Sequence, residues 1–197
     1  MEILHILDKL DKDLLIFLNQ LYHPVLDPIM LYATERFFWI PFYACLIIFI
    51  FWKLRLEGIW ILLTIALLIV AADQFASGLL KPLTERLRPC HNEEVIPYLR
   101  LLKNCGGQYG FISSHAANTF ALAVFLSLVF KKVKWMMLLY PWAFLVSYSR
   151  VYLAVHYPGD ILAGAVSGAV WGIVFYYLYK QSFKLTKQRP IPELIKD

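Results

Sequence analysis

Long apolar runs, separated by short charged stretches, dominate the hydrophobic pattern of this chain. Five runs contain few or no charged residues and approach the length of about 20 residues that a helix needs to cross a bilayer. They are 37–52, 58–76, 116–130, 135–149 and 161–179. This pattern predicts an all-α, polytopic transmembrane helical bundle with five spans.

The first segment, "MEILHILDKLDKDLLIFLNQL", mixes charged and apolar residues at helical spacing, and no small-residue cleavage site follows an early apolar core. It therefore predicts an amphipathic helix on the membrane surface and not a signal peptide. No internal repeat or flexible linker divides the chain. We expect one integral membrane domain at 1–180 and a polar cytoplasmic tail at 181–197.

Composition supports a membrane protein, because 60% of the 197 residues are hydrophobic and the mean hydropathy is +0.59. An average soluble domain has roughly 45–50% apolar residues.

Lysines concentrate in the short loop at 131–134 and in the tail, which we expect to face the cytoplasm. The long loop 77–112 then faces outward, on the extracytoplasmic side of a bacterial inner (plasma) membrane. The net charge of +5 needs no nucleic acid partner.

Polar groups gather on this outward side. Three segments reach it, namely "KPLTERLRP" (81–89), "GFISSHAANTF" (110–120) and "SRVYLAVHYPGD" (149–160), and two spans separate the second segment from the third. Their candidate site residues are Lys81, Arg88, Ser113, Ser114, His115, Arg150, His156 and Asp160. Three cations suit the oxygens of a phosphate group. A helix that begins near Ser113 would add unpaired backbone N–H groups to such an anion site.

The two histidines and the carboxylate supply the groups that phosphoryl chemistry requires. His156 and Asp160 are four residues apart, so the carboxylate can hold one ring nitrogen and leave the other free to attack phosphorus. The same side chains could instead ligate zinc, but three neighbouring cations would oppose a divalent ion. We expect no metal ion and no other cofactor.

The order and spacing of these segments resemble the three-part signature of the type 2 phosphatidic acid phosphatase (PAP2) family, K-x6-R-P, P-S-G-H and S-R-x5-H-x3-D. The first and third parts match at Lys81, Arg88, Pro89, Ser149, Arg150, His156 and Asp160. The second part keeps Ser113 and His115 but has Ile112 in place of the proline and Ser114 in place of the glycine.

The resemblance implies a PAP2/haloperoxidase-like core and metal-independent hydrolysis of a phosphate or diphosphate monoester on a membrane lipid. His156 would form a phosphohistidine, Asp160 would fix its tautomer, and His115 would protonate the leaving oxygen. The residues that would hold the phosphate are Lys81, Arg88, Arg150, Ser113 and Ser114.

Several substrates and two other classes of protein fit this site. Our first expectation is undecaprenyl diphosphate, converted to undecaprenyl phosphate for cell-wall synthesis; the alternatives are phosphatidylglycerophosphate, phosphatidate and lipid A. A non-catalytic protein that binds or transports phosphate lipids would need the cations but not His115, His156 and Asp160. A vanadate-dependent haloperoxidase is disfavoured because the chain has membrane spans in place of amphipathic helices.

The three cysteines have different expected environments. Cys45 lies inside the first span, where we expect a small, buried apolar residue. Cys90 and Cys105 lie in the outward loop, on the oxidising side of the membrane, where a disulfide would connect the first motif to the segment before the second.

Asp73 and Gln74, late in the second span, are expected to face the bundle because a carboxylate facing lipid is costly. A structural hydrogen bond is the favoured role for them, ahead of contact with substrate.

Overall fold

The computed structural model describes residues 2–185, which form helices and no β-strand. The α-helices are α1 (Glu2–Gln20), α2 (Leu26–Ala33), α3 (Ile40–Leu54), α4 (Gly58–Asp73), α5 (Lys81–Thr84), α6 (Ser114–Val129), α7 (Leu139–Tyr152) and α8 (Pro158–Leu185). Each of the five expected spans falls on one of the long helices α3, α4, α6, α7 and α8. Most of the expected polar tail lies outside the described residues.

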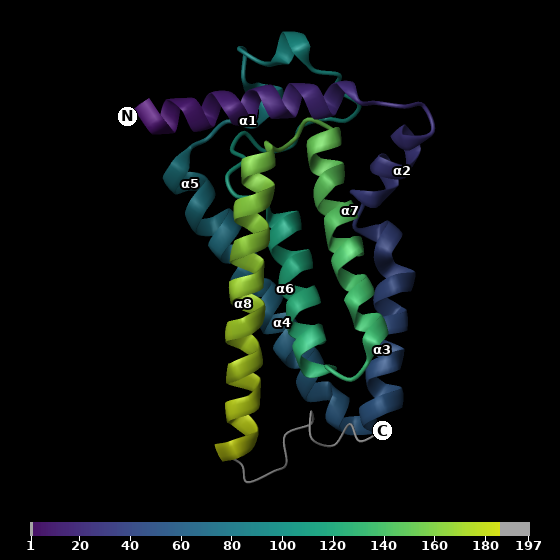
Figure 1. The fold of residues 1–197 in the computed structure, drawn as a ribbon. Helices are drawn as coiled ribbons and strands as arrows, with labels where there is room; N and C mark the ends of the chain where they lie inside the picture. Colours follow the sequence, from purple (N-terminus) through teal and green to yellow (C-terminus); the bar gives the residue numbers. More distant parts are fainter. Residues whose placement is uncertain (1, 186–197) are drawn as a thin grey trace.

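The five long helices lie side by side, and α1 crosses one end of the bundle (Figure 1). Buried apolar side chains of the core include Ile61, Leu68, Phe125, Leu126 and Val129. Large apolar side chains also cover the outside, where Ile48, Trp52, Leu67, Phe144 and Leu162 are each more than 60% exposed. Such a surface is unfavourable in water but suits the hydrocarbon of a bilayer. The all-helical membrane bundle is therefore confirmed.

Helix length alone identifies fewer spans than the hydrophobic pattern does. Among residues 2–185, two helical runs are long and apolar enough to cross a membrane, Phe37–Thr84 with 48 residues and Pro158–Ser182 with 25. The first run reverses direction at Arg55, which has a φ of 54°, so α3 and α4 are neighbours that run in opposite directions (Figure 1). Helix α6 is shorter, with 16 residues.

Glycines bring α8 into close contact with α6. A Cβ atom added at Gly168 would lie 2.1 Å from the carbonyl oxygen of Ala117, and one added at Gly164 would lie 2.6 Å from the carbonyl oxygen of Ser113. The small residues of 164–172 thus act in helix packing. This packing places the start of α8 beside the start of α6, where two of the motifs meet.

Two expectations about single residues in the spans are wrong. Cys45 is exposed on α3, and Gln74 is exposed beyond the end of α4. Both lie in apolar runs whose sequence does not distinguish the face toward the bundle from the face toward lipid, because such runs are hydrophobic all round.

Candidate active site

The start of α6 is fixed by a capping serine and by α8. Ser113 is the N-cap residue; its Oγ accepts a hydrogen bond from the backbone N–H of Ala116 at 3.4 Å. The backbone N–H of Ser113 donates to the carbonyl oxygen of Asp160 at 3.1 Å. Ser113 is fully buried and does not line the cavity described below, so its hydroxyl caps α6 and stabilises the start of this helix.

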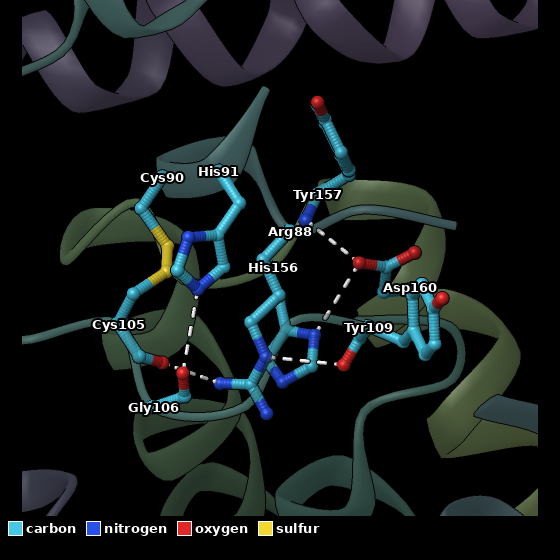
Figure 2. Close-up of a disulfide and its surroundings, with 9 residues drawn as sticks. All are labelled: Arg88, Cys90, His91, Cys105, Gly106, Tyr109, His156, Tyr157 and Asp160. Atoms are coloured by element: carbon cyan, nitrogen blue, oxygen red, sulfur yellow. Dashed lines mark hydrogen bonds and ion pairs between the residues drawn. A yellow bond between two sulfur atoms is a disulfide. The ribbon is translucent and has the colours of Figure 1, made fainter. Parts of the chain in front are cut away.

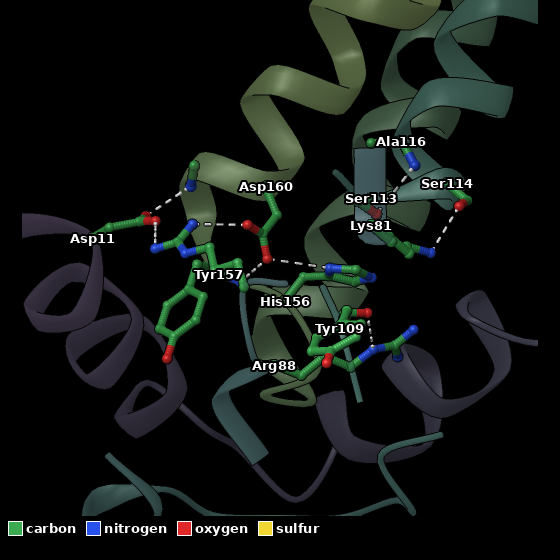
Figure 3. Close-up of polar contacts among 12 residues, drawn as sticks. Asp11, Lys81, Arg88, Tyr109, Ser113, Ser114, Ala116, His156, Tyr157 and Asp160 are labelled. Carbon is green, nitrogen blue, oxygen red and sulfur yellow. Dashed lines mark hydrogen bonds and ion pairs between the residues drawn. The ribbon is translucent and has the colours of Figure 1, made fainter. Parts of the chain in front are cut away.

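Lys81 reaches the same helix start from the other side. Its Nζ donates to Ser114 Oγ at 3.0 Å (Figure 3). It also donates to Ser77 Oγ at 3.4 Å, and the two serine hydroxyls are 2.7 Å apart. Lys81 directly follows η3 (Gln74–Leu80), a π-helical segment that continues α4. Such segments shift the register of the side chains that follow and are frequent at functional sites.

Arg88 is held by the backbone of the outward loop. Its Nη1 donates to the carbonyl oxygen of Cys105 at 2.8 Å, and its Nε donates to that of Tyr109 at 3.1 Å. A disulfide joins Cys105 to Cys90, two residues after Arg88, with their Cα atoms 6.0 Å apart (Figure 2). The loop thus restricts the guanidinium group to one orientation.

Arg150 is a buried cation on α7, with an exposed fraction of 8%. Its Nη1 donates to Thr34 Oγ1, whereas its Nε is buried and has no hydrogen-bond acceptor within residues 2–185. A buried donor without an acceptor costs free energy. A bound phosphate oxygen would supply the acceptor that this guanidinium group lacks.

His156 and Asp160 form a buried pair at the turn between α7 and α8. The His156 Nδ1 lies 3.3 Å from Asp160 Oδ2, which also accepts the backbone N–H of Tyr157 at 3.0 Å (Figure 3). Burial lowers the pKa of His156 to about 4, even though Asp160 acts to raise it. The ring is therefore neutral at pH 7, and a proton on Nδ1 facing the carboxylate leaves Nε2 with a free lone pair.

Arg86 is a site residue to which the sequence analysis gave no role. Its Nη1 donates to Asp160 Oδ1 at 2.8 Å, and its Nη2 donates to Asp11 Oδ2 at 2.8 Å and to Asp8 Oδ1 at 3.2 Å. Its only distinguishing feature in the sequence is its position two residues before Arg88.

One cavity of about 830 Å³ connects these groups to the interior of the bundle. Its polar end includes Lys81, Arg88, Ser114, His115, Arg150 and His156. Its apolar walls include Leu46, Ile50, Leu62, Ile65, Leu126 and Trp142, from α3, α4, α6 and α7. Asp160 and Ser113 lie behind the polar wall. The structure thus brings the eight predicted site residues together at one end of a largely apolar cavity.

Asp73 also lines this cavity, where its Oδ1 accepts a hydrogen bond from Asn118 Nδ2 at 3.2 Å. This contact agrees with the expected orientation toward the bundle and with a structural hydrogen bond. Within residues 2–185, no group of three or more His, Cys, Asp and Glu side chains is arranged to hold a metal ion.

Known proteins similar to this chain share its fold and much of its length. A lipid A 4′-phosphatase of Bacteroides thetaiotaomicron is 39% identical over 194 residues, covering 94% of this chain and 84% of that protein. A lipid A 4′-phosphatase of Porphyromonas gingivalis is 32% identical over 178 residues, covering 88% and 75%. The crystal structure of a transmembrane PAP2 type phosphatidylglycerolphosphate phosphatase from Bacillus subtilis superposes with a TM-score of 0.66 at 22% identity, covering 93% of this chain and 88% of that chain.

The family model described as the PAP2 superfamily matches residues 62–184, which contain all three sequence motifs and all or most of four of the five long helices. Together with the two relatives, this match assigns both family and general activity. The chain belongs to the PAP2 superfamily and is a membrane lipid phosphatase.

Proposed function

We propose that this enzyme removes the 4′-phosphate of lipid A or of a closely related acylated sugar phosphate. The observation that carries this proposal is the continuity of a cationic pocket with an apolar cavity, which suits a phosphate attached to a lipid. Both relatives described above bear the name lipid A 4′-phosphatase. They favour lipid A over undecaprenyl diphosphate, the first expectation from the sequence.

Binding begins with the phosphate among Lys81, Arg88 and Arg150. Arg88 is oriented by two backbone carbonyls, and Arg150 offers its unpaired Nε. Ser114 and the first backbone N–H groups of α6 add donors and the positive end of the helix dipole. Fixed donors of this kind stabilise the charge on the equatorial oxygens of the phosphoryl group in the transition state of its transfer.

His156 is the proposed nucleophile. Its Nε2 forms a bond to phosphorus as the bond between phosphorus and the lipid oxygen breaks, while Asp160 holds Nδ1–H and stabilises the imidazolium that forms. His115, at the start of α6 on the cavity wall, donates a proton to the leaving oxygen. The products of this half-reaction are the dephosphorylated lipid and a phosphohistidine.

Water completes the cycle in the second half-reaction. His115 takes a proton from a water molecule, whose oxygen bonds to phosphorus as the P–N bond to His156 breaks. Inorganic phosphate then leaves, His156 is neutral again, and His115 again carries the proton that it donates in the next turnover. The described cations supply the charge stabilisation that a metal ion gives in other phosphatases, so the proposed reaction is metal-independent.

We further propose that α3, α4, α6, α7 and α8 are five membrane spans within one domain at 1–180, with the tail 181–197 in the cytoplasm. The site, α1 and the disulfide lie at one end of the bundle and would face outward from a bacterial inner membrane (Figures 1 and 2). A lipid could then enter the cavity sideways from the outer leaflet.

The substrate assignment is tested by phosphate release from purified protein in detergent with excess EDTA. The panel contains bisphosphorylated lipid A, undecaprenyl diphosphate, phosphatidylglycerophosphate and phosphatidate, and mass spectrometry locates the phosphate that lipid A loses. We expect the highest kcat/KM for lipid A, loss of the 4′-phosphate, and no turnover by His156→Ala. Faster turnover of undecaprenyl diphosphate would overturn the substrate assignment, and activity that requires an added metal would overturn the mechanism.

A further inference from the structure

Arg86 joins the catalytic carboxylate to the helix that crosses the end of the bundle. One guanidinium nitrogen donates to Asp160 at 2.8 Å, and the other donates to Asp11 of α1 at 2.8 Å. The guanidinium carbon also lies 4.2 Å from the centroid of the Tyr157 ring. Figure 3 shows Asp11, Asp160 and His156 following one another along this connection.

Arg86 balances the charge of Asp160 on the side away from His156. Asp160 Oδ2 accepts from His156 and from the backbone of Tyr157, while Oδ1 accepts from Arg86. The carboxylate is fully buried, and burying an ionised carboxylate is costly unless a cation and hydrogen bonds accompany it. Without Arg86, Oδ1 would lose its hydrogen-bond donor and the carboxylate could rotate toward another donor, which would release the Nδ1 of His156.

Asp11 holds both Arg86 and the start of α8. Its Oδ1 accepts the backbone N–H of Gly159 at 2.7 Å, one residue before Asp160. A Cβ atom at position 159 would lie 2.7 Å from Asp11 Oδ2, so only glycine leaves room for this approach. The carboxylate thus sits at the N-terminus of α8, where the helix dipole favours an anion.

The rest of α1 is suited to the membrane surface. Its inner face packs on the bundle through Leu15, which contacts Val151 and Tyr157. A second stripe at helical spacing is apolar and exposed, and consists of Ile3, Leu7, Leu10, Leu14 and Phe17. A helix with such a stripe lies in the lipid interface. The same helix therefore contacts lipid on one side and supplies Asp11 to the site on another.

We propose that Arg86 is a positioning residue that holds Asp160 in place for His156. Arg86 is itself held by Asp11 of α1, so phosphoryl transfer depends on the packing of α1 over the site. The inference rests on the proposed roles of His156 and Asp160. Arg86 does not line the substrate cavity. Its loss should therefore slow the chemical step and leave substrate binding unchanged.

The test compares kcat and KM for the lipid substrate in four variants. Arg86→Gln should lower kcat by about 100-fold with KM within about twofold, because a small misplacement of a reacting group costs about that factor. Arg86→Lys keeps the positive charge but not the paired N–H donors of a guanidinium group, and its kcat should fall about tenfold. Asp11→Asn keeps an acceptor for the backbone N–H of Gly159, and its kcat should also fall about tenfold. Asp13→Asn removes the same charge from an exposed position on α1 and should match the wild type.

Thermal unfolding of each variant in the same detergent separates positioning from folding. An unchanged kcat in folded Arg86→Gln, or a rise in KM without a fall in kcat, would overturn the inference. If Arg86→Gln does not fold, Asp11→Asn decides by the same criteria. A wild-type protein that hydrolyses no lipid phosphate of the panel would contradict the proposed function itself, whereas an active wild type with a fully active Arg86→Gln contradicts only the role of Arg86.

Discussion

The proposed role of His156 as a nucleophile needs a neutral ring at pH 7, and the surroundings of this residue disfavour the charged ring. An imidazole is ordinarily half protonated near pH 6.5, and burial lowers the pKa of His156 to about 4. Since the pKa is lowered, the ring gains a proton only as the pH falls toward 4. We expect the ¹⁵N signals of its ring, identified by their absence in His156→Ala, to stay at neutral-form positions from pH 8 to pH 5. A midpoint near pH 6.5 would contradict this prediction.

Motif spacing predicted most of the site residues but not the partners that hold them. Lys81, His115 and His156 were predicted to share one site because the order of the apolar runs places their segments at the same end of the bundle. Arg86 could not be predicted, because its partners Asp8 and Asp11 are 78 and 75 positions away in the sequence. Only the docking of α1 across the bundle brings these groups together.

At the scale of secondary structure, the contact between α6 and α8 aligns the two halves of the site. Helix α6 carries His115, and α8 carries Asp160. Gly168→Ala should separate the helices, because the added Cβ would lie 2.1 Å from a backbone oxygen of α6. Overpacking of this kind costs about 1–3 kcal/mol. We expect a lower thermal unfolding midpoint and a lower kcat.

The matched control for this prediction is Gly107→Ala in the outward loop. A Cβ atom at Gly107 would have no neighbour within 4 Å, so this variant should unfold at the wild-type temperature. Equal midpoints for the two variants would show that the close approach of α6 and α8 does not limit stability.

The disulfide gives the outward loop a fixed shape around Arg88. Cys90 and Cys105 are 15 positions apart, and a bridge of this span restricts the unfolded chain by about 3 kcal/mol on the chain-entropy model. Cys105→Ser should lower the unfolding midpoint. It should also raise KM, because the carbonyl oxygen of residue 105 orients Arg88. Cys45→Ser, which removes a free thiol from α3, should change neither quantity and serves as the control.

The expected ends of the spans differ from the ends of the helices, and the second span is an example. The run 58–76 was expected to continue past Asp73, but α4 ends at that residue and a π-helical segment follows. Composition does not encode this change, because Phe75, Leu79 and Leu80 continue the apolar character. The change bears on the proposed site, since the π-helical segment directly precedes Lys81.

For the molecule as a whole, the arrangement of charge and apolar surface favours one orientation in the membrane. The site lies at the end of the bundle that α1 crosses, and the turn between α6 and α7 lies at the opposite end (Figure 1). That turn contains Lys131, Lys132 and Lys134, and short lysine-rich loops face the cytoplasm. A site on the outward face would meet lipid phosphates of the outer leaflet and release phosphate away from the cytoplasm.

Cysteine labelling of intact spheroplasts tests this orientation directly. In a Cys45→Ser background without reductant, the disulfide occupies the other two cysteines, so one introduced thiol reports one position. Asp13→Cys, exposed on α1, should react with a membrane-impermeant maleimide in intact cells. Lys131→Cys, exposed at the opposite end, should react only after the membrane is disrupted. The reverse pattern would place the site in the cytoplasm, where the enzyme could act only on phosphate lipids of the inner leaflet.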